Sequence, residues 1–184
     1  MDFAKEEHNM ARYLIVVDMQ KDFIDGSLGT AEATAIVEPV NQLVAGWEGP
    51  VIFTRDTHYE NYMETQEGRN LPVPHCIYGT DGWQLEPGLQ RQCDARKSRV
   101  FDKPTFGSME LSAFLSEKHT EDAIDEIVLV GLCTDICVIS NAMLLKAHFL
   151  ETPIRVDSAC CAGVTPATHD AALTTMKMCQ IIIK

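Results

Sequence analysis

The sequence predicts an α/β fold with a mainly parallel sheet, because short apolar runs alternate with stretches of helical periodicity. The runs are continuous and mostly β-branched, as expected of strands that are covered on both faces. They occupy Tyr13–Val17, Val51–Thr54, Arg99–Phe101, Ile127–Val130 and Ile154–Val156, with Ile181–Ile183 as a sixth candidate. Strands and helices that alternate in this way are typical of parallel sheets with helices packed on them.

Helical spacing of apolar residues separates several of these runs. The predicted helices are Ile36–Trp47, a segment that Ser108 can cap, Cys137–Phe149 and Pro166 to about Met178. Pro39 would lie in the first turn of its helix, where proline is tolerated. Thr165 and Pro166 have the residue types that helices favour at the N-cap and at the first helical position.

The segment Asp56–Gln92 interrupts this alternation. It contains glycines, prolines and polar residues with little periodicity, which predicts a long loop. A loop of this length inside a compact domain is usually functional. The chain shows no internal repeat, low-complexity segment or linker, so we expect one domain over residues 1–184.

The composition excludes some classes of partner. The net charge of −12 and a pI of about 4.8 disfavour nucleic acid, because an acidic surface repels phosphate groups. No apolar run is long enough to span a bilayer. The first ten residues are charged and polar, unlike a signal peptide, so we expect a cytoplasmic protein. The seven cysteines are then expected to be reduced thiols.

Reactive side chains follow four of the predicted strands. They are Asp18 after the first, Arg55, Asp56 and His58 after the second, Asp102 and Lys103 after the third, and Cys133 and Cys137 after the fourth. Open α/β sheets bind their ligands beyond the carboxyl ends of the strands. We therefore expect these groups to converge on one crevice that forms an active site.

Cys137 is the candidate nucleophile, because it lies where the helix through Phe149 should begin. The positive end of a helix dipole favours a thiolate, and the free N–H groups there can hold an oxyanion. Cys133 is a rival, and both thiols could simply be buried apolar groups. A zinc site of Cys133, Cys137, Cys160 and Cys161 is a further alternative, but the spacings match no common zinc motif.

Asp56, His58 and His75 form a candidate metal site. Two histidines and a carboxylate are a common set of three protein ligands with open coordination positions. The set suits zinc, and iron or manganese are also compatible. Glu67, or less favourably Glu64, is a candidate for a further ligand.

Several segments together resemble the isochorismatase-like cysteine hydrolase superfamily, and specifically its nicotinamidase branch. They are Leu14–Phe23, Thr54–His58, His75–Thr80, Phe101–Ser108 and Gly131–Val138. Each match is weak alone, but the matches occur in the order of the family. The resemblance implies a three-layer α/β/α domain with a six-stranded, mainly parallel sheet of Rossmann-like topology.

The resemblance also implies a catalytic triad of Asp18, Lys103 and Cys137. Backbone N–H groups of Cys133 and Cys137 would form the oxyanion hole, after a cis peptide bond between Leu132 and Cys133. A divalent metal, most plausibly zinc, would be held by the histidine and carboxylate set. Phe23 would form one aromatic wall of the substrate pocket.

The implied activity is hydrolysis of a small amide, foremost nicotinamide to nicotinic acid and ammonia, through a thioester on Cys137. Such families often form homo-oligomers. The stretch Leu71–His75 lacks the tryptophan that nicotinamidases usually carry before the third metal ligand, which leaves other amides and carbamoyl compounds open. The alternatives are an isochorismatase-type cleavage of a vinyl ether and a non-catalytic binding domain. No glycine-rich phosphate loop supports the latter.

Overall fold

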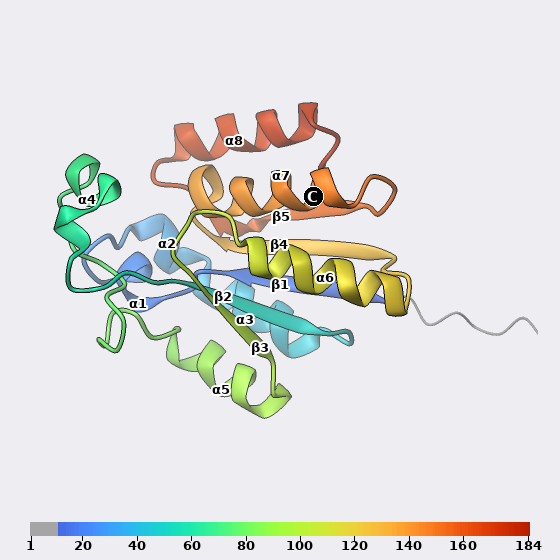
Figure 1. Ribbon diagram of the computed structural model, residues 1–184, viewed down its shortest axis with the longest axis horizontal. Coiled ribbons are helices and arrows are strands. Elements are labelled where there is room, and N and C mark those ends of the chain that lie inside the picture. Colours follow the sequence, from blue (N-terminus) through green and yellow to red (C-terminus); the bar gives the residue numbers. More distant parts are fainter. Residues whose placement is uncertain (1–10) are drawn as a thin grey trace, which may run out of the picture.

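The computed structural model describes residues 11–184 and contains a six-stranded parallel sheet (Figure 1). The strand order is β3-β2-β1-β4-β5-β6. The strands are β1 (Arg12–Val17), β2 (Val51–Asp56), β3 (Arg99–Lys103), β4 (Glu126–Leu132), β5 (Ile154–Ala162) and β6 (Ile182–Ile183). The predicted fold class and all six predicted strands are confirmed, and β2, β3, β4 and β5 extend beyond their predicted ends.

Helices cover both faces of the sheet. They are α1 (Lys21–Ile24), α2 (Ala31–Ala35), α3 (Val37–Gly46), α4 (Gln66–Asn70), α5 (Pro87–Arg96), α6 (Met109–Glu121), α7 (Ile139–His148) and α8 (Pro166–Met178). Helices α6, α7 and α8 lie on one face, and α3 and α5 lie on the other (Figure 1). The three layers of the predicted α/β/α arrangement are therefore present.

The predicted loop Asp56–Gln92 is wrong in part, because it contains regular structure. A 3₁₀ turn (η1, Tyr62–Glu64) and α4 lie within it, and α5 begins at Pro87. Helix α5 was missed because its sequence is mostly polar and buries little more than Leu89 and Cys93. Its start was visible in the sequence, since the Glu86 side chain caps it and Pro87 occupies a first-turn position.

The two central strands carry the core. Residues 14–17 of β1 are fully buried, and every residue of β4 is buried. The two strands approach closely at Gly131, which has a φ of +113°, and a Cβ there would lie 2.1 Å from Val17 O. Only glycine fits this position without shifting the backbone. The end of β4 is thereby held against the end of β1.

Two further observations concern the cysteines and the length of the helices. All seven cysteines are free thiols. Within residues 11–184, none of the helices has the length and apolarity that a transmembrane segment requires. The expectation about the first ten residues lies outside the described part of the chain.

Glu126, the first residue of β4, forms ion pairs with residues on both neighbouring strands, β1 and β5. Its carboxylate lies 2.7 Å from guanidinium nitrogens of both Arg12 on β1 and Arg155 on β5. Burial alone would raise the pKa of this carboxyl group, but the two guanidinium groups lower it below its usual value. The ionised form is therefore the one that stabilises the sheet.

We expect Glu126→Gln to lower the free energy of unfolding at pH 7 by about 1–2 kcal/mol, discounted because both guanidinium groups are partly exposed. A carboxyl group with a lowered pKa contributes its stability above the unfolded-state pKa and loses it as the pH falls through the folded-state pKa. The difference between variant and wild type should therefore shrink below pH 4.5, the ordinary value. Urea denaturation of wild type and variant, at pH 7 and below pH 4.5, measures this difference in the free energy of unfolding.

Glu121→Gln is the matched control, because Glu121 forms an exposed ion pair with Lys118 within α6. It should change the unfolding free energy by less than about 0.5 kcal/mol. An equal loss in both variants, or a loss that does not depend on pH, would contradict the role of Glu126.

Candidate active site and metal site

The carboxyl ends of β1, β2, β3 and β4 meet in one place. Asp18 follows β1 directly and has a φ of +47°, the left-handed region. Thr54 on β2 fixes it, since its hydroxyl donates to Asp18 Oδ1 at 2.6 Å. On the neighbouring strands Asp56 and Lys103 are paired in register. The convergence predicted from the strand ends is therefore present for these residues.

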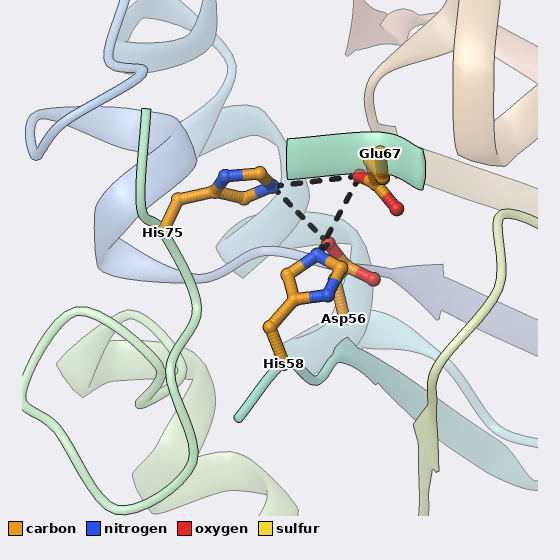
Figure 2. Close-up of side chains that lie close together, drawn as sticks. All are labelled: Asp56, His58, Glu67 and His75. Atoms are coloured by element: carbon orange, nitrogen blue, oxygen red, sulfur yellow. Dashed lines mark ion pairs between the residues drawn. The ribbon is translucent and has the colours of Figure 1, made fainter. Parts of the chain in front are cut away.

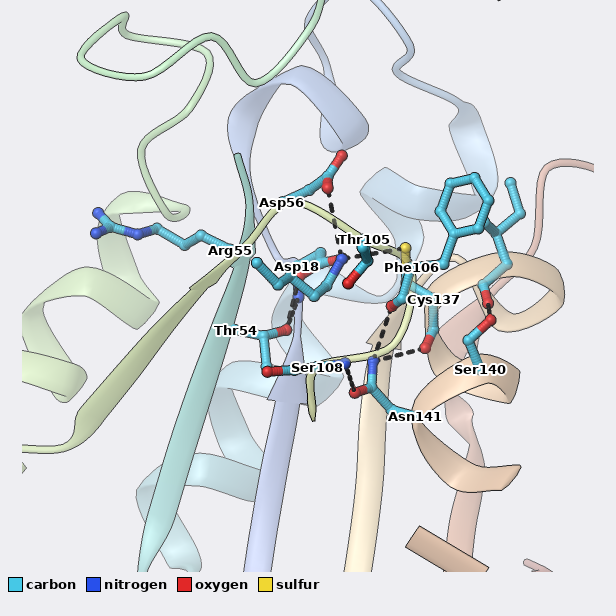
Figure 3. Close-up of polar contacts among 12 residues, drawn as sticks. Asp18, Thr54, Arg55, Asp56, Thr105, Phe106, Ser108, Cys137, Ser140 and Asn141 are labelled. Atoms are coloured by element: carbon cyan, nitrogen blue, oxygen red, sulfur yellow. Dashed lines mark hydrogen bonds and ion pairs between the residues drawn. The ribbon is translucent and has the colours of Figure 1, made fainter. Parts of the chain in front are cut away.

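Lys103 contacts the other members of this cluster, of which Figure 3 shows Asp18, Asp56 and Cys137. Its Nζ lies 2.6 Å from Asp18 Oδ2, 3.5 Å from Asp56 Oδ1 and 3.4 Å from Cys137 Sγ. The side chain is almost completely buried. The structure thus brings together the three residues expected to form a triad and links them to a fourth, Asp56.

The charges in this cluster depend on one another. Burial alone would lower the pKa of Lys103, but the charges of Asp18 and Asp56 raise it, so the ammonium group is retained. Burial raises the pKa of Asp18, and Lys103 opposes that shift. A carboxylate with a raised pKa is a stronger base than one in water.

Cys137 lies in a π-helical turn rather than at the first residue of an α-helix. This turn, η2 (Thr134–Val138), connects β4 to α7 and follows a cis peptide bond between Leu132 and Cys133, as the resemblance implied. The expected lowering of the thiol pKa is wrong. Burial and the nearby Asp18 carboxylate raise the pKa of Cys137, and Lys103 only partly opposes them. The thiol therefore carries its proton at rest.

Arg55 and Asp102 do not join the crevice. They are paired in register on β2 and β3, one position before Asp56 and Lys103, so they point to the opposite face of the sheet. The two side chains bind each other, with Arg55 Nε 2.7 Å from Asp102 Oδ1. The alternation of side chains along a strand explains this correction, because adjacent residues cannot both face one crevice.

The candidate metal ligands form a second cluster beside the first (Figure 2). One ligand atom from each of Asp56, His58, Glu67 and His75 lies within 4.8 Å of the others. Asp56 Oδ2 lies 3.0 Å from His58 Nε2 and 3.5 Å from His75 Nε2. Glu67, on the short helix α4, lies in the group, and Glu64 does not belong to it.

Two features suit this cluster to a metal ion. His75 Nδ1 lies 2.8 Å from Val73 O, which orients Nε2 toward the carboxylates in the way that outer contacts orient metal ligands. His58 Nε2 is buried and makes no hydrogen bond, although Asp56 is near. A buried nitrogen without a partner is costly unless a cation or another group satisfies it. The group can therefore hold a divalent metal ion.

Gln20 is a supporting residue that the sequence analysis missed. It is fully buried, its side chain accepts from Asp56 N at 2.7 Å, and its amide donates to Asp56 O and to Trp83 O. These bonds fix the backbone of the residue that both clusters share. Its position two residues after Asp18 was the only available signal.

Asn141 on α7 is a second supporting residue (Figure 3). Its amide donates to Cys137 O at 2.8 Å and to Phe106 O at 3.2 Å, and its Oδ1 accepts from Ser108 N. It therefore ties the turn with the thiol to the loop that follows Lys103. A buried asparagine one helical turn after a candidate nucleophile could have indicated such a role.

A cavity of about 650 Å³ opens onto both clusters. Cys133, Cys137, Asp56, Glu67 and His75 line it. Phe23 also lines it, with its ring centroid 5.5 Å from that of His75. Trp83 lies elsewhere, under the guanidinium group of Arg55 and bonded to Thr57, so it does not replace the absent tryptophan in this cavity.

Fold and site together define an α/β domain with the parts of a cysteine-dependent hydrolase: a buried thiol, a carboxylate, an ammonium group and an adjoining metal-ligand cluster. The isochorismatase domain profile matches residues 12–184. The chain therefore belongs to the isochorismatase family.

Proteins of known name are similar to this chain in sequence and in structure. The nicotinamidase/pyrazinamidase of Mycobacterium tuberculosis is 29% identical over 92% of this chain and 96% of its own length. The crystal structure of the Streptococcus mutans pyrazinamidase/nicotinamidase has a TM-score of 0.79 and 27% identity, covering 94% of this chain and 99% of that one. The Pyrococcus horikoshii pyrazinamidase, solved with zinc, has a TM-score of 0.75 and 25% identity, covering 95% and 98%.

We expect Asn141→Leu to lower the free energy of unfolding by about 2–3 kcal/mol, because one buried N–H and two carbonyl groups lose their partner. Ser140→Ala, which removes a single bond to Ile136 O from the neighbouring residue, should lower it by less than about 1 kcal/mol. Chemical denaturation of both variants compares them. A loss in Asn141→Leu no larger than that of the control would show that this tie contributes little.

Proposed function

We propose that this protein hydrolyses nicotinamide to nicotinic acid and ammonia, with Cys137 as the nucleophile. The observation that carries the proposal is the position of Lys103 Nζ, 2.6 Å from Asp18 and 3.4 Å from Cys137. Cys137 in turn lines a cavity together with three members of the metal-ligand cluster, Asp56, Glu67 and His75. The named relatives support the substrate class.

The first half of the reaction forms a thioester. Asp18 accepts the proton of the Cys137 thiol as the sulfur attacks the amide carbon, and a C–S bond forms. Backbone N–H groups of Cys133 and Cys137 hold the resulting oxyanion. The C–N bond then breaks, and Asp18 returns the proton to the leaving nitrogen, which departs as ammonia. Lys103 keeps Asp18 in place and balances the negative charge of the cluster.

The second half releases the acid. Water attacks the thioester carbon and Asp18 accepts its proton, so that a C–O bond forms. The C–S bond breaks, and the proton returns to the sulfur. Nicotinic acid leaves, and Cys137 is again a thiol. The raised pKa of Asp18 suits it to accept and return a proton in both halves.

A divalent metal ion, zinc in our proposal, would be held by Asp56, His58, Glu67 and His75. The two nitrogen and two carboxylate ligands, together with the unsatisfied His58 Nε2, fit such an ion. When bound, it would supply a Lewis acid for the pyridine nitrogen of the substrate, which would orient the amide. Phe23, beside His75, would then pack against the pyridine ring.

A vinyl-ether cleavage of the isochorismatase type is less well supported. That reaction requires neither a cysteine nucleophile nor a set of histidine and carboxylate ligands, and this chain places both on one cavity. A non-catalytic binding domain would have no need of a buried ammonium group between a carboxylate and a thiol.

We expect Cys137→Ala to lower kcat for nicotinamide by about 10⁴-fold or more, because the C–S bond cannot form. Ammonia release from purified protein measures the loss. Mass spectrometry after rapid quenching should detect a nicotinoyl adduct on the wild-type thiol. Cys179→Ala, at the end of α8, is the control and should retain full turnover. Ammonia release by Cys137→Ala at the wild-type rate would refute the nucleophile.

We expect His58→Ala to lose most of its bound divalent metal, since it removes a buried ligand and leaves three. Elemental analysis of the purified variant gives the metal content without reference to activity. His148→Ala, at the exposed end of α7, should keep the wild-type content. Equal metal content in both variants would remove His58 from the site.

A further inference from the structure

The cavity is larger than a single aromatic ring requires. Its volume of about 650 Å³ falls within the range of about 300–1,000 Å³ that is typical of pockets for drug-sized ligands. A pyridine amide held by the metal ligands at one point and by Cys137 at another would fill only part of it. The side chains that line the unfilled part of the cavity indicate what else could bind there.

The charged and titratable part of the lining is confined to a few residues. Asp56, Glu67 and His75 form one polar group. Lys103 links this group to Cys137, because its ammonium group lies near both Asp56 and the Cys137 sulfur. The other lining residues are mainly apolar, namely Phe23, Leu28, Ala33, Leu71, Pro104, Phe106, Leu132, Ile136 and Val164, with Thr30, Gln66, Asn70 and Thr105 as the uncharged polar side chains among them. A ligand that uses the whole cavity therefore meets charged groups and the thiol at one end and a mainly apolar, uncharged lining at the other.

The outer part of this apolar lining faces solvent. Leu71, Phe106 and Val164 are 38%, 46% and 49% exposed. They come from three separate segments, after α4, between β3 and α6, and between β5 and α8, and the fold brings them to one cavity. Exposed apolar side chains are ordinary when scattered, but a group of them around a cavity marks a binding surface.

The position of Phe106 is fixed by the structure. Asn141 donates to its carbonyl oxygen, and Thr105 donates to the carbonyl oxygen of Gly107 within the same loop. The loop therefore holds an exposed phenyl ring beside the turn that carries Cys137 (Figure 3). An anchored loop that presents an aromatic ring to solvent is suited to contact a ligand.

We propose that the site takes aromatic carboxamides that carry an apolar group on the ring, and that Leu71, Phe106 and Val164 determine this specificity. This proposal rests on the proposed amidase function and names its substrate class. The substituent would occupy the ring position that is meta to both the ring nitrogen and the amide. From there it points away from the metal ligands and from Cys137, toward the apolar outer lining.

The experiment compares nicotinamide with 5-phenylnicotinamide on the full-length, metal-loaded protein, and measures kcat/KM from ammonia release. We expect the wild type to cleave both amides. Leu71→Trp should lower the ratio of kcat/KM for the phenyl amide to that for nicotinamide by about 10-fold or more, because the indole fills the outer cavity. Val164→Asp should lower the same ratio by placing a charge against the phenyl group.

Leu150→Trp is the matched control. Leu150 is also exposed, at 72%, but it follows α7 at the opposite end of the sheet. This variant should leave the ratio unchanged. Partial misfolding of a variant would lower kcat/KM for both amides by the same factor. The ratio of the two values would then stay unchanged.

The outcomes separate the two proposals. Cleavage of nicotinamide without cleavage of the phenyl amide would overturn the inference and leave the proposed function standing. Cleavage of the phenyl amide alone would support the inference and overturn nicotinamide as the substrate. A ratio unchanged in Leu71→Trp and Val164→Asp would remove these residues from specificity, and failure on both amides would overturn both proposals.

Discussion

The buried ammonium group of Lys103 is the constraint on which the site depends. A charge removed from water is tolerated only when it is paired, and here Asp18 and Asp56 supply the pairing from two neighbouring strands. Without the lysine, the two buried carboxylates would share one crevice with no cation between them. The same ammonium group contacts Cys137, so the chemistry and the stability of the crevice rest on one side chain.

The surrounding fold serves to hold these groups at fixed distances. Gly131 allows β4 to end against β1, Thr54 holds Asp18 in its left-handed turn, and Gln20 fixes the backbone of Asp56. Asp56 is shared, because one of its carboxylate oxygens faces Lys103 and the other faces His58 and His75. The thiol cluster and the metal-ligand cluster are therefore two sides of one buried network rather than independent sites.

Much of this arrangement was predictable from sequence, because parallel strands bury continuous apolar runs and place their carboxyl ends together. That rule located Asp18, Asp56, Lys103 and Cys137. It failed for Arg55 and Asp102, since strand ends alone do not say which face a side chain takes. Helix α5 was missed because few of its residues are buried. The thiol pKa was misjudged because Cys137 lies in a buried turn, where desolvation and the Asp18 carboxylate raise its pKa. Gln20 and Asn141 were missed because their main bonds reach residues distant in sequence, Asp56 and Trp83 for Gln20 and Phe106 and Ser108 for Asn141, so only their spacing from Asp18 and Cys137 was visible.

The strand order has a consequence for how the protein comes into being. The sheet grows outward in one direction from β1 to β3 and in the other from β4 to β6, so the crevice lies where the two halves meet. The segment from β1 to β3 contains Asp18, Asp56, Lys103, His58 and His75, whereas Cys137 follows β4. During synthesis the proton acceptor and the candidate metal ligands are therefore made before Cys137, the candidate nucleophile. Reactivity can arise only at the last stage, when the halves join.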